Sequence, residues 1–281
     1  MLSVIHGRGQ KEVFIEGLRL MRSGTLFIII ASILSFIAGV LLLFALSWFI
    51  PRYTGISIAP PIEIMPVAAN HPGRVLEDFL ERILRSPRLL MMGLIIVIFL
   101  LASAILNLIG LWARFIPGVR RLGSVNLEFS TASTLIGVGY FWGYLIILVA
   151  LITGISALAY TISTRNLFGV VASAMGLLAG VLIGGLLVFI GNIGLIILVY
   201  RLHEHEKNPL YLASAVLFIV YIIASFISMA PYIGSFISII DSALLFIAWI
   251  LLYIVLGESI SRAGATPSQP TPPTPPIPPP L

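Results

Sequence analysis

One carboxylate stands inside a long apolar run near the end of the sequence. Asp241 lies in a stretch from Ile233 to Leu256 that is otherwise dominated by Ile, Leu, Ala and Phe. Such a stretch is long enough to cross a bilayer, where an ionisable side chain is costly and marks a functional-site hypothesis. Asp241 is therefore the first candidate for chemistry.

The preceding apolar stretch supplies partners for this carboxylate. Only the short turn "MAPYIG" separates the two stretches, so residues equally far from it should stand at equal depth, with Ser225 opposite Ser238 and Tyr221 opposite Asp241. We expect Tyr221 or Ser225 to hydrogen-bond Asp241. Two interpretations stay open, a neutral acid that packs the hairpin and an ion or proton site; the first is favoured because transport sites usually contain further ionisable groups.

Two asparagines and a row of glycines are the other notable residues of the apolar stretches. Asn107 and Asn192 are expected near the inner ends of their helices, facing each other or bonded to local backbone. Gly176, Gly180 and Gly184 recur every four residues, a spacing typical of close helix packing in membranes. A substrate path lined by backbone is the alternative.

No residue set in the apolar stretches predicts catalysis. They contain no His and no Lys, so no Ser/His/Asp set can be assembled, and the chain has no cysteine. His203 and His205 in "HEHEK" are two residues apart without a third ligand cluster, which favours a solvated charged turn over a metal site. We expect neither an enzyme nor a cofactor or metal.

The composition predicts the elements that hold these residues. The chain has 281 residues, of which 59% are hydrophobic and 10% charged, far more apolar than a soluble protein. Six stretches reach the length of a spanning helix, the fourth being longer than a bilayer is thick. The predicted fold is an all-α, polytopic transmembrane helix bundle with spans at 24–50, 88–112, 132–162, 167–200, 210–230 and 233–257.

The distribution of basic residues predicts the orientation. Ten of the 16 Lys and Arg residues lie on the side of the termini, and short cytoplasmic loops carry the excess of basic residues. Both termini are therefore predicted to be cytoplasmic, in a cell membrane. The net charge is +5, but the basic residues are spread over several loops and form no dense patch. Anionic membrane lipids are therefore favoured over nucleic acid as their binding partner.

Three segments outside the spans have patterns of their own. Residues 73–86 predict an amphipathic helix that lies on the membrane surface or on the tops of neighbouring spans, with a docking face for a partner as the alternative. Residues 1–23 predict a weaker amphipathic leader on the cytoplasmic side. Residues 258–281 are predicted to form a disordered tail, because nine of the last 15 residues are proline. The transmembrane domain is placed at 24–257.

Two motifs resemble an archaeal family of multipass membrane proteins of unknown function. In that family a Gly-Leu, a basic stretch and Gly-Thr-Leu-Phe open the first span, matched here by Gly17, Leu18, Arg22 and residues 24–27. The family's exit from a later span resembles Ile193, Gly194, Leu195, Tyr200, Arg201, Leu202 and Glu204, with His203 where a glycine is commoner. The resemblance implies an archaeal plasma-membrane protein and supplies no activity.

These observations favour a non-catalytic membrane component. The predicted role is a scaffold or accessory subunit of a membrane or envelope assembly, with a protein partner or a second copy of the chain as its partner. A transporter or channel for a small solute or ion is the alternative, because a pore could be lined by Ser and Gly around Asp241.

Overall fold

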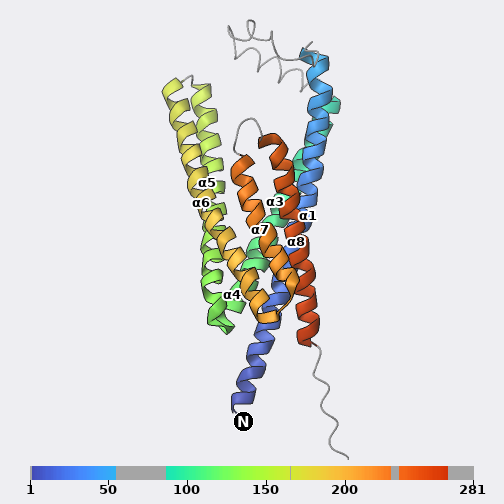
Figure 1. Cartoon of the computed structure of the whole chain (residues 1–281). Coiled ribbons are helices and arrows are strands. Elements are labelled where there is room, and N and C mark those ends of the chain that lie inside the picture. Colours follow the sequence, from blue (N-terminus) through green and yellow to red (C-terminus); the bar gives the residue numbers. More distant parts are fainter. Residues whose placement is uncertain (1, 55–86, 165, 229–233, 265–281) are drawn as a thin grey trace, which may run out of the picture. The chain divides into compact units, whose positions relative to one another are not determined.

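The computed structural model describes residues 2–54, 87–164, 166–228 and 234–264, and every regular element in these ranges is helical (Figure 1). The predicted all-α class is confirmed. The predicted surface helix at 73–86 and residues 265–281 of the predicted tail lie outside the described residues. The elements are α1 (Leu2–Thr54), α3 (Pro87–Leu108), the π-helix η1 (Ile109–Phe115), α4 (Ile116–Val125), α5 (Leu127–Ser163), α6 (Leu167–Glu206), α7 (Pro209–Ser228) and α8 (Gly234–Gly264).

Six helical stretches within the described ranges are long and apolar enough to cross a membrane, as predicted. They are Gln10–Ala45, Leu90–Val125, Leu127–Thr161, Phe168–Glu206, Pro209–Ser228 and Ile240–Ala263. The chain divides into two compact units, unit 1 formed by Met1–Arg22 and Ile116–Leu281, and unit 2 by Ser23–Phe115.

Unit 2 is an antiparallel pair of helices with a seam of small residues. A Cβ added at Gly24 of α1 would lie 2.6 Å from the carbonyl oxygen of Gly110, so the two backbones are in direct contact there. Further along the seam, Ser103 Oγ donates to the carbonyl oxygen of Ala31 at 2.8 Å and lies 2.7 Å from Ser35 Oγ. Small residues and hydroxyls hold helices together where lipid removes the hydrophobic drive.

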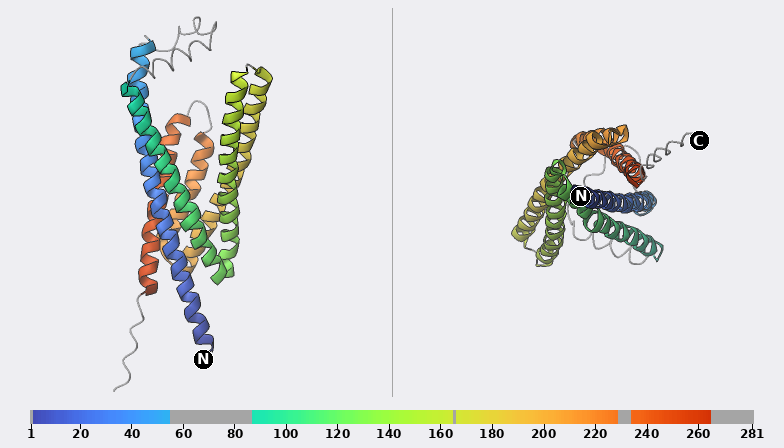
Figure 2. Two further views of the ribbon diagram at one scale, coloured as in Figure 1. Left: turned by 180° about the vertical axis from the view of Figure 1, so that it is seen from behind. Right: turned by 90° about the horizontal axis from the view of Figure 1, so that it is seen from below.

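In unit 1, α5 and α6 form a long hairpin and run side by side in Figure 1 and in the two views of Figure 2. A Cβ added at Gly139 would lie 2.3 Å from the backbone nitrogen of Gly191, and one added at Gly143 would lie 2.9 Å from the carbonyl oxygen of Gly184. Glycines on both helices therefore allow backbone contact along this seam.

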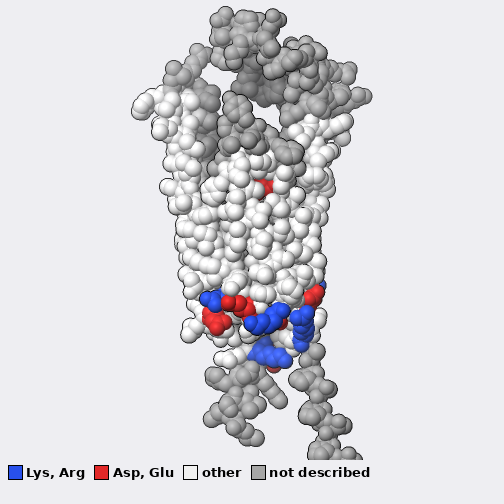
Figure 3. Space-filling model, viewed as in Figure 1, with Lys and Arg blue, Asp and Glu red and all other residues white. Residues whose placement is uncertain are grey.

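The core of unit 1 lies where the starts of α1, α5 and α7 meet the ends of α6 and α8 around α4. The fully buried large side chains at this end are Leu18, Met21, Leu122, Phe129, Leu198, Leu202, Tyr211 and Leu252. Most of the described acidic and basic side chains on the face seen in Figure 3 gather at the same end. We call it the charged end of unit 1; one of its ion pairs joins Glu16 of α1 to Arg121 of α4.

Asparagines begin three helices of unit 1. Asn126 Oδ1 accepts from the N–H of Glu128 at 3.0 Å, and Asn166 Oδ1 accepts from the N–H of Gly169 at 3.0 Å. Asn208 precedes Pro209, which suits the first turn of α7 because its missing N–H would have no helical partner there. These caps satisfy donors that a helix start leaves unpaired.

The helices extend beyond the predicted spans. The predicted leader 1–23 and first span belong to one helix, α1, and α8 continues through residues 258–264, which the sequence assigned to the tail. Charged side chains can pair along a helix, as Glu258 does with Arg262. Helix α8 therefore continues past the point where the sequence becomes polar. The second span also runs on through η1 and α4. The π-helix ends two residues before Pro117, which has no N–H for the regular ladder.

Candidate functional site

The structure brings Asp241 and Ser225 together. Ser225 Oγ of α7 donates to Asp241 Oδ1 of α8 at 2.9 Å, and the side chain of Tyr221 interacts with the same serine near the carboxylate. Of the two predicted partners, Tyr221 and Ser225, it is Ser225 whose hydroxyl bonds to the carboxylate. The side chain of Ser238 lies outside the described residues.

Asn192 bonds to a tyrosine of the neighbouring helix. Tyr140 Oη of α5 donates to Asn192 Oδ1 of α6 at 2.7 Å, a side-chain partner that the sequence analysis did not consider. Asn107 is an exposed residue of α3 in unit 2. The pairing of the two amides stays a prediction, since they belong to different units.

The three glycines of α6 have different surroundings. A Cβ added at Gly184 would lie 2.5 Å from Ile147 and one at Gly180 would lie 2.4 Å from the Cβ of Ala150, so both face α5. A Cβ added at Gly176 would meet nothing within 4 Å, and this glycine is exposed. Two of the three thus lie in the α5–α6 seam.

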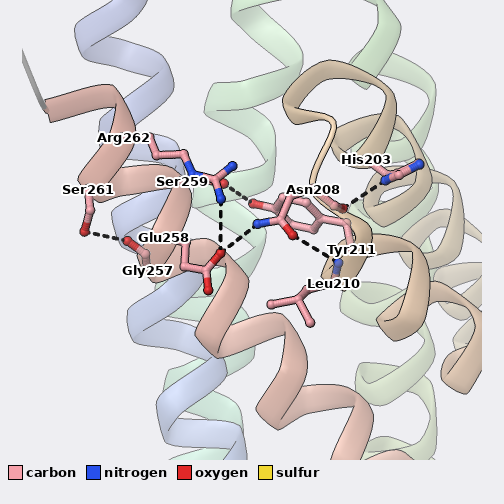
Figure 4. A network of polar contacts seen from close by, with 9 residues as sticks. All are labelled: His203, Asn208, Leu210, Tyr211, Gly257, Glu258, Ser259, Ser261 and Arg262. Carbon is pink, nitrogen blue, oxygen red and sulfur yellow. Dashed lines mark hydrogen bonds and ion pairs between the residues drawn. The ribbon is translucent and has the colours of Figure 1, made fainter.

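A polar network joins α6, α7 and α8 at the charged end (Figure 4). Asn208, only 3% exposed, is its centre: Nδ2 donates to Glu258 Oε2 at 2.8 Å, and Oδ1 accepts from the N–H of Leu210 at 3.0 Å. Its backbone oxygen lies 2.9 Å from Nδ1 of His203. Glu258 Oε2 also pairs with Arg262 Nη2 at 3.5 Å, so this carboxylate is held from two sides.

Buried hydroxyls extend this network toward the middle of the hairpin. Tyr211 Oη and Ser259 Oγ, both in fully buried residues, lie 3.0 Å apart, and Ser214 Oγ donates to the carbonyl oxygen of Ala248 at 3.0 Å. Together with the pair at Asp241, hydrogen bonds join α7 to α8 at several depths. Each satisfies a polar group that lipid could not.

An open cleft of about 510 Å³ lies beside the network, lined by α8 and by Arg22 of α1. The Cζ atom of Arg22 lies 4.7 Å from the ring centroid of Tyr253, a cation–π distance. A Cβ added at Gly257 would lie 2.9 Å from Cζ and 3.0 Å from Nε of Arg22, so glycine leaves room for the guanidinium. The cleft residues are Arg22, Tyr253, Ile254, Gly257, Glu258, Ser261 and Arg262.

The two histidines of "HEHEK" are engaged separately. His203 holds the backbone of Asn208, whereas the ring of His205 lies 5.4 Å from that of Phe14 and 6.1 Å from that of Phe129. Within the described ranges, no group of three or more metal-ligating side chains is found. The structural roles of the histidines were not foreseen from their spacing.

The sequence analysis missed Asn208, Glu258, Ser259 and the Arg22 cleft. Glu258 and Ser259 fell in the predicted tail, because the span was ended at the first charged residue. The hairpin argument that paired Asp241 with α7 could have been continued to the ends of both helices, where Tyr211 and Ser259 meet. Arg22 and Gly257 are far apart in the sequence, and no pattern near either residue indicated that they would be in contact.

The chain was compared with known families, curated proteins and solved structures. No curated protein and no solved structure matches it. A family model described as a protein of unknown function (DUF973) matches residues 14–280, which cover all the described helices except the first twelve residues of α1. On this match over nearly the whole chain, with six apolar helices, the protein is an integral membrane protein that belongs to the DUF973 family of unknown function.

Proposed function

We propose that the protein is a non-catalytic component of a membrane assembly, a scaffold or accessory subunit. The observation that carries the proposal is that polar side chains of the spans bond to one another inside unit 1. Asp241 is held by Ser225, Asn192 by Tyr140, and Tyr211 by Ser259. Groups used in this way stabilise helix packing.

The surroundings of the histidines support a role without catalysis. A catalytic base must be placed within hydrogen-bond reach of a nucleophile. His203 instead contacts the backbone oxygen of Asn208, between α6 and α7, and His205 packs against two phenylalanine rings. Both side chains stabilise the junction of helices at the charged end.

The proposed location is a cell membrane, with both termini in the cytoplasm. The charged end of unit 1 carries the beginning of α1 and the end of α8, in agreement with the positive-inside count. The resemblance at residues 17–27 supports an archaeal membrane. The proposed partners are membrane lipids and either a second protein or further copies of this chain.

Transport of a small solute or ion is the second candidate, and Asp241 is the observation that favours it. Away from the charged end, it is the one acidic or basic side chain in the middle of the described spans. Intramembrane carboxylates often bind ions or protons. Its bond to Ser225 favours a packing role over this one.

The experiment compares assembly with transport in the same preparation. The full chain is extracted in a mild detergent, its oligomeric state and any stoichiometric protein partner are measured by native mass spectrometry, and the pure protein is tested for proton and ion flux in liposomes. The Asp241→Asn variant is compared with Glu204→Gln, which removes an acid from the exposed Arg201 ion pair at the charged end.

We expect a stoichiometric partner or a defined oligomer, and no flux above empty liposomes. A flux that Asp241→Asn abolishes and Glu204→Gln preserves would overturn the proposal and make Asp241 a transport residue. A monomer that co-purifies with no partner would also contradict a subunit role.

A further inference from the structure

Arg22 lines the cleft with one of its guanidinium donors unpaired among the described residues. Its guanidinium lies over Tyr253, and among the described residues its Nε atom is buried without a hydrogen-bond partner. A buried donor without an acceptor is costly, and a cation–π contact replaces none of the lost hydrogen bonds. The position therefore suits an acceptor supplied by a ligand.

The cleft offers a second cation and a hydroxyl. Arg262 and Ser261 line it from α8, so two arginines face one carboxylate, that of Glu258. Glu258 Oε2 is already occupied by Asn208 at 2.8 Å, whereas its contact with Arg262 Nη2 is long, at 3.5 Å. The lining thus keeps an excess of one positive charge and the unpaired Nε donor of Arg22.

We propose that this cleft binds a phosphate group, carried by an anionic phospholipid headgroup or by a soluble phosphate compound. Guanidinium groups match phosphate oxygens with two parallel N–H donors, which makes arginine the preferred residue for such ligands. The cleft opens at the charged end of unit 1, where the headgroup layer meets the helices, and basic pockets between membrane helices bind lipid headgroups. The exposed side chain of Ile254 on its wall provides an apolar neighbour for an acyl chain.

Gly257 allows a test that leaves the charge of the cleft unchanged. An alanine at this position would place its Cβ 2.9 Å from Cζ and 3.0 Å from Nη2 of Arg22, closer than ordinary contacts allow. The guanidinium must then shift from its place over Tyr253. Gly257→Ala should therefore weaken binding of the ligand, as removal of the Arg22 charge does, although no charged residue is altered.

The experiment titrates the full chain, purified in detergent, and measures bound ligand by native mass spectrometry. The probes are phosphatidylglycerol, phosphatidylcholine, glycerol phosphate and inorganic phosphate. The variants are Gly257→Ala and Arg22→Gln, and the matched controls are Gly176→Ala, at a glycine with open space, and Arg19→Gln, at an exposed arginine on the same helix. Circular dichroism and gel filtration check that each variant is folded.

We expect phosphatidylglycerol to bind more tightly than phosphatidylcholine, and both cleft variants to weaken it by about fivefold or more, as for loss of one membrane-surface cation. The two controls should stay within about twofold of the unchanged chain. Displacement of the lipid by glycerol phosphate or inorganic phosphate, with the same loss in the variants, would support the same site with a soluble source. Equal binding of phosphatidylglycerol to the unchanged chain and to folded Gly257→Ala would overturn the proposal, whatever partner the protein has.

Discussion

Replacement of Gly139 by alanine tests the close packing of α5 on α6. The added Cβ would lie 2.3 Å from the backbone nitrogen of Gly191, 2.5 Å from its Cα and 2.6 Å from the carbonyl oxygen of Leu187. Ordinary van der Waals contacts of a Cβ begin near 3.4 Å, and all three of these neighbours are backbone atoms. No side chain can rotate to relieve the overlap, so the two helices must separate by about 1 Å.

The expected cost follows from this overlap. Adding atoms to a packed interior destabilises by about 1–3 kcal/mol, and the upper half applies when backbone must move. Separation would also loosen the neighbouring contact between Gly143 and Gly184, since both pairs lie on one seam. We expect Gly139→Ala to lower the free energy of unfolding by about 2–3 kcal/mol.

The assay is reversible unfolding of the full chain in mixed micelles, with helix content as the probe. Gly176→Ala and Gly185→Ala are matched controls on α6, because a Cβ at either position would meet nothing within 4 Å. Their effect should stay within about 0.5 kcal/mol, as for ordinary surface changes. If Gly139→Ala falls in this small range too, α5 and α6 do not pack backbone to backbone and the reasoning fails.

Three further predictions concern the other helix contacts and the topology. Asp241→Asn should change the free energy of unfolding by less than about 1 kcal/mol, because an amide oxygen still accepts from Ser225; a larger loss in mixed-micelle unfolding would show that the charge itself stabilises the hairpin. Ser103→Ala should cost about 1 kcal/mol in the same assay, since both of its contacts with α1 disappear, and an unchanged stability would contradict the seam of unit 2. Single cysteines at Gly9 and at Ser268 should label with an impermeant maleimide from the same side of the membrane, and labelling from opposite sides would exclude an even number of spans.

The fold class and the number of spans could be predicted from the sequence, because apolar runs of about 20 residues leave few alternatives. The ends of the helices could not be predicted in the same way. Hydropathy falls at the first charged residue, whereas α8 continues through Glu258 and Arg262, whose side chains pair with each other. The π-helix also has no hydropathy pattern of its own, and the sequence analysis predicted a plain helix there.

The candidate site was predicted in part. The turn between α7 and α8 was enough to bring Asp241 and Ser225 together, because an antiparallel hairpin fixes the depth of both residues. The Arg22 cleft depends on the contact of α1 with α8, which cannot be predicted from the spacing of residues within either helix. The role of Gly257 depends on the same approach, because its missing side chain leaves the space in which the guanidinium lies.

The hairpin of α5 and α6 has a consequence for the lipid around it. These helices have 37 and 40 residues, so α6 is about 60 Å long, whereas α7 in the same unit has 20 residues and is about 30 Å long. A hydrocarbon core of about 30 Å matches α7, but next to α5 and α6 the bilayer must thicken, or the hairpin must tilt or extend beyond it. The elastic cost of such mismatch is smaller in a thicker membrane, and it is also smaller where two copies share one deformed ring of lipid. Bilayer thickness therefore affects where in a membrane this protein is most stable.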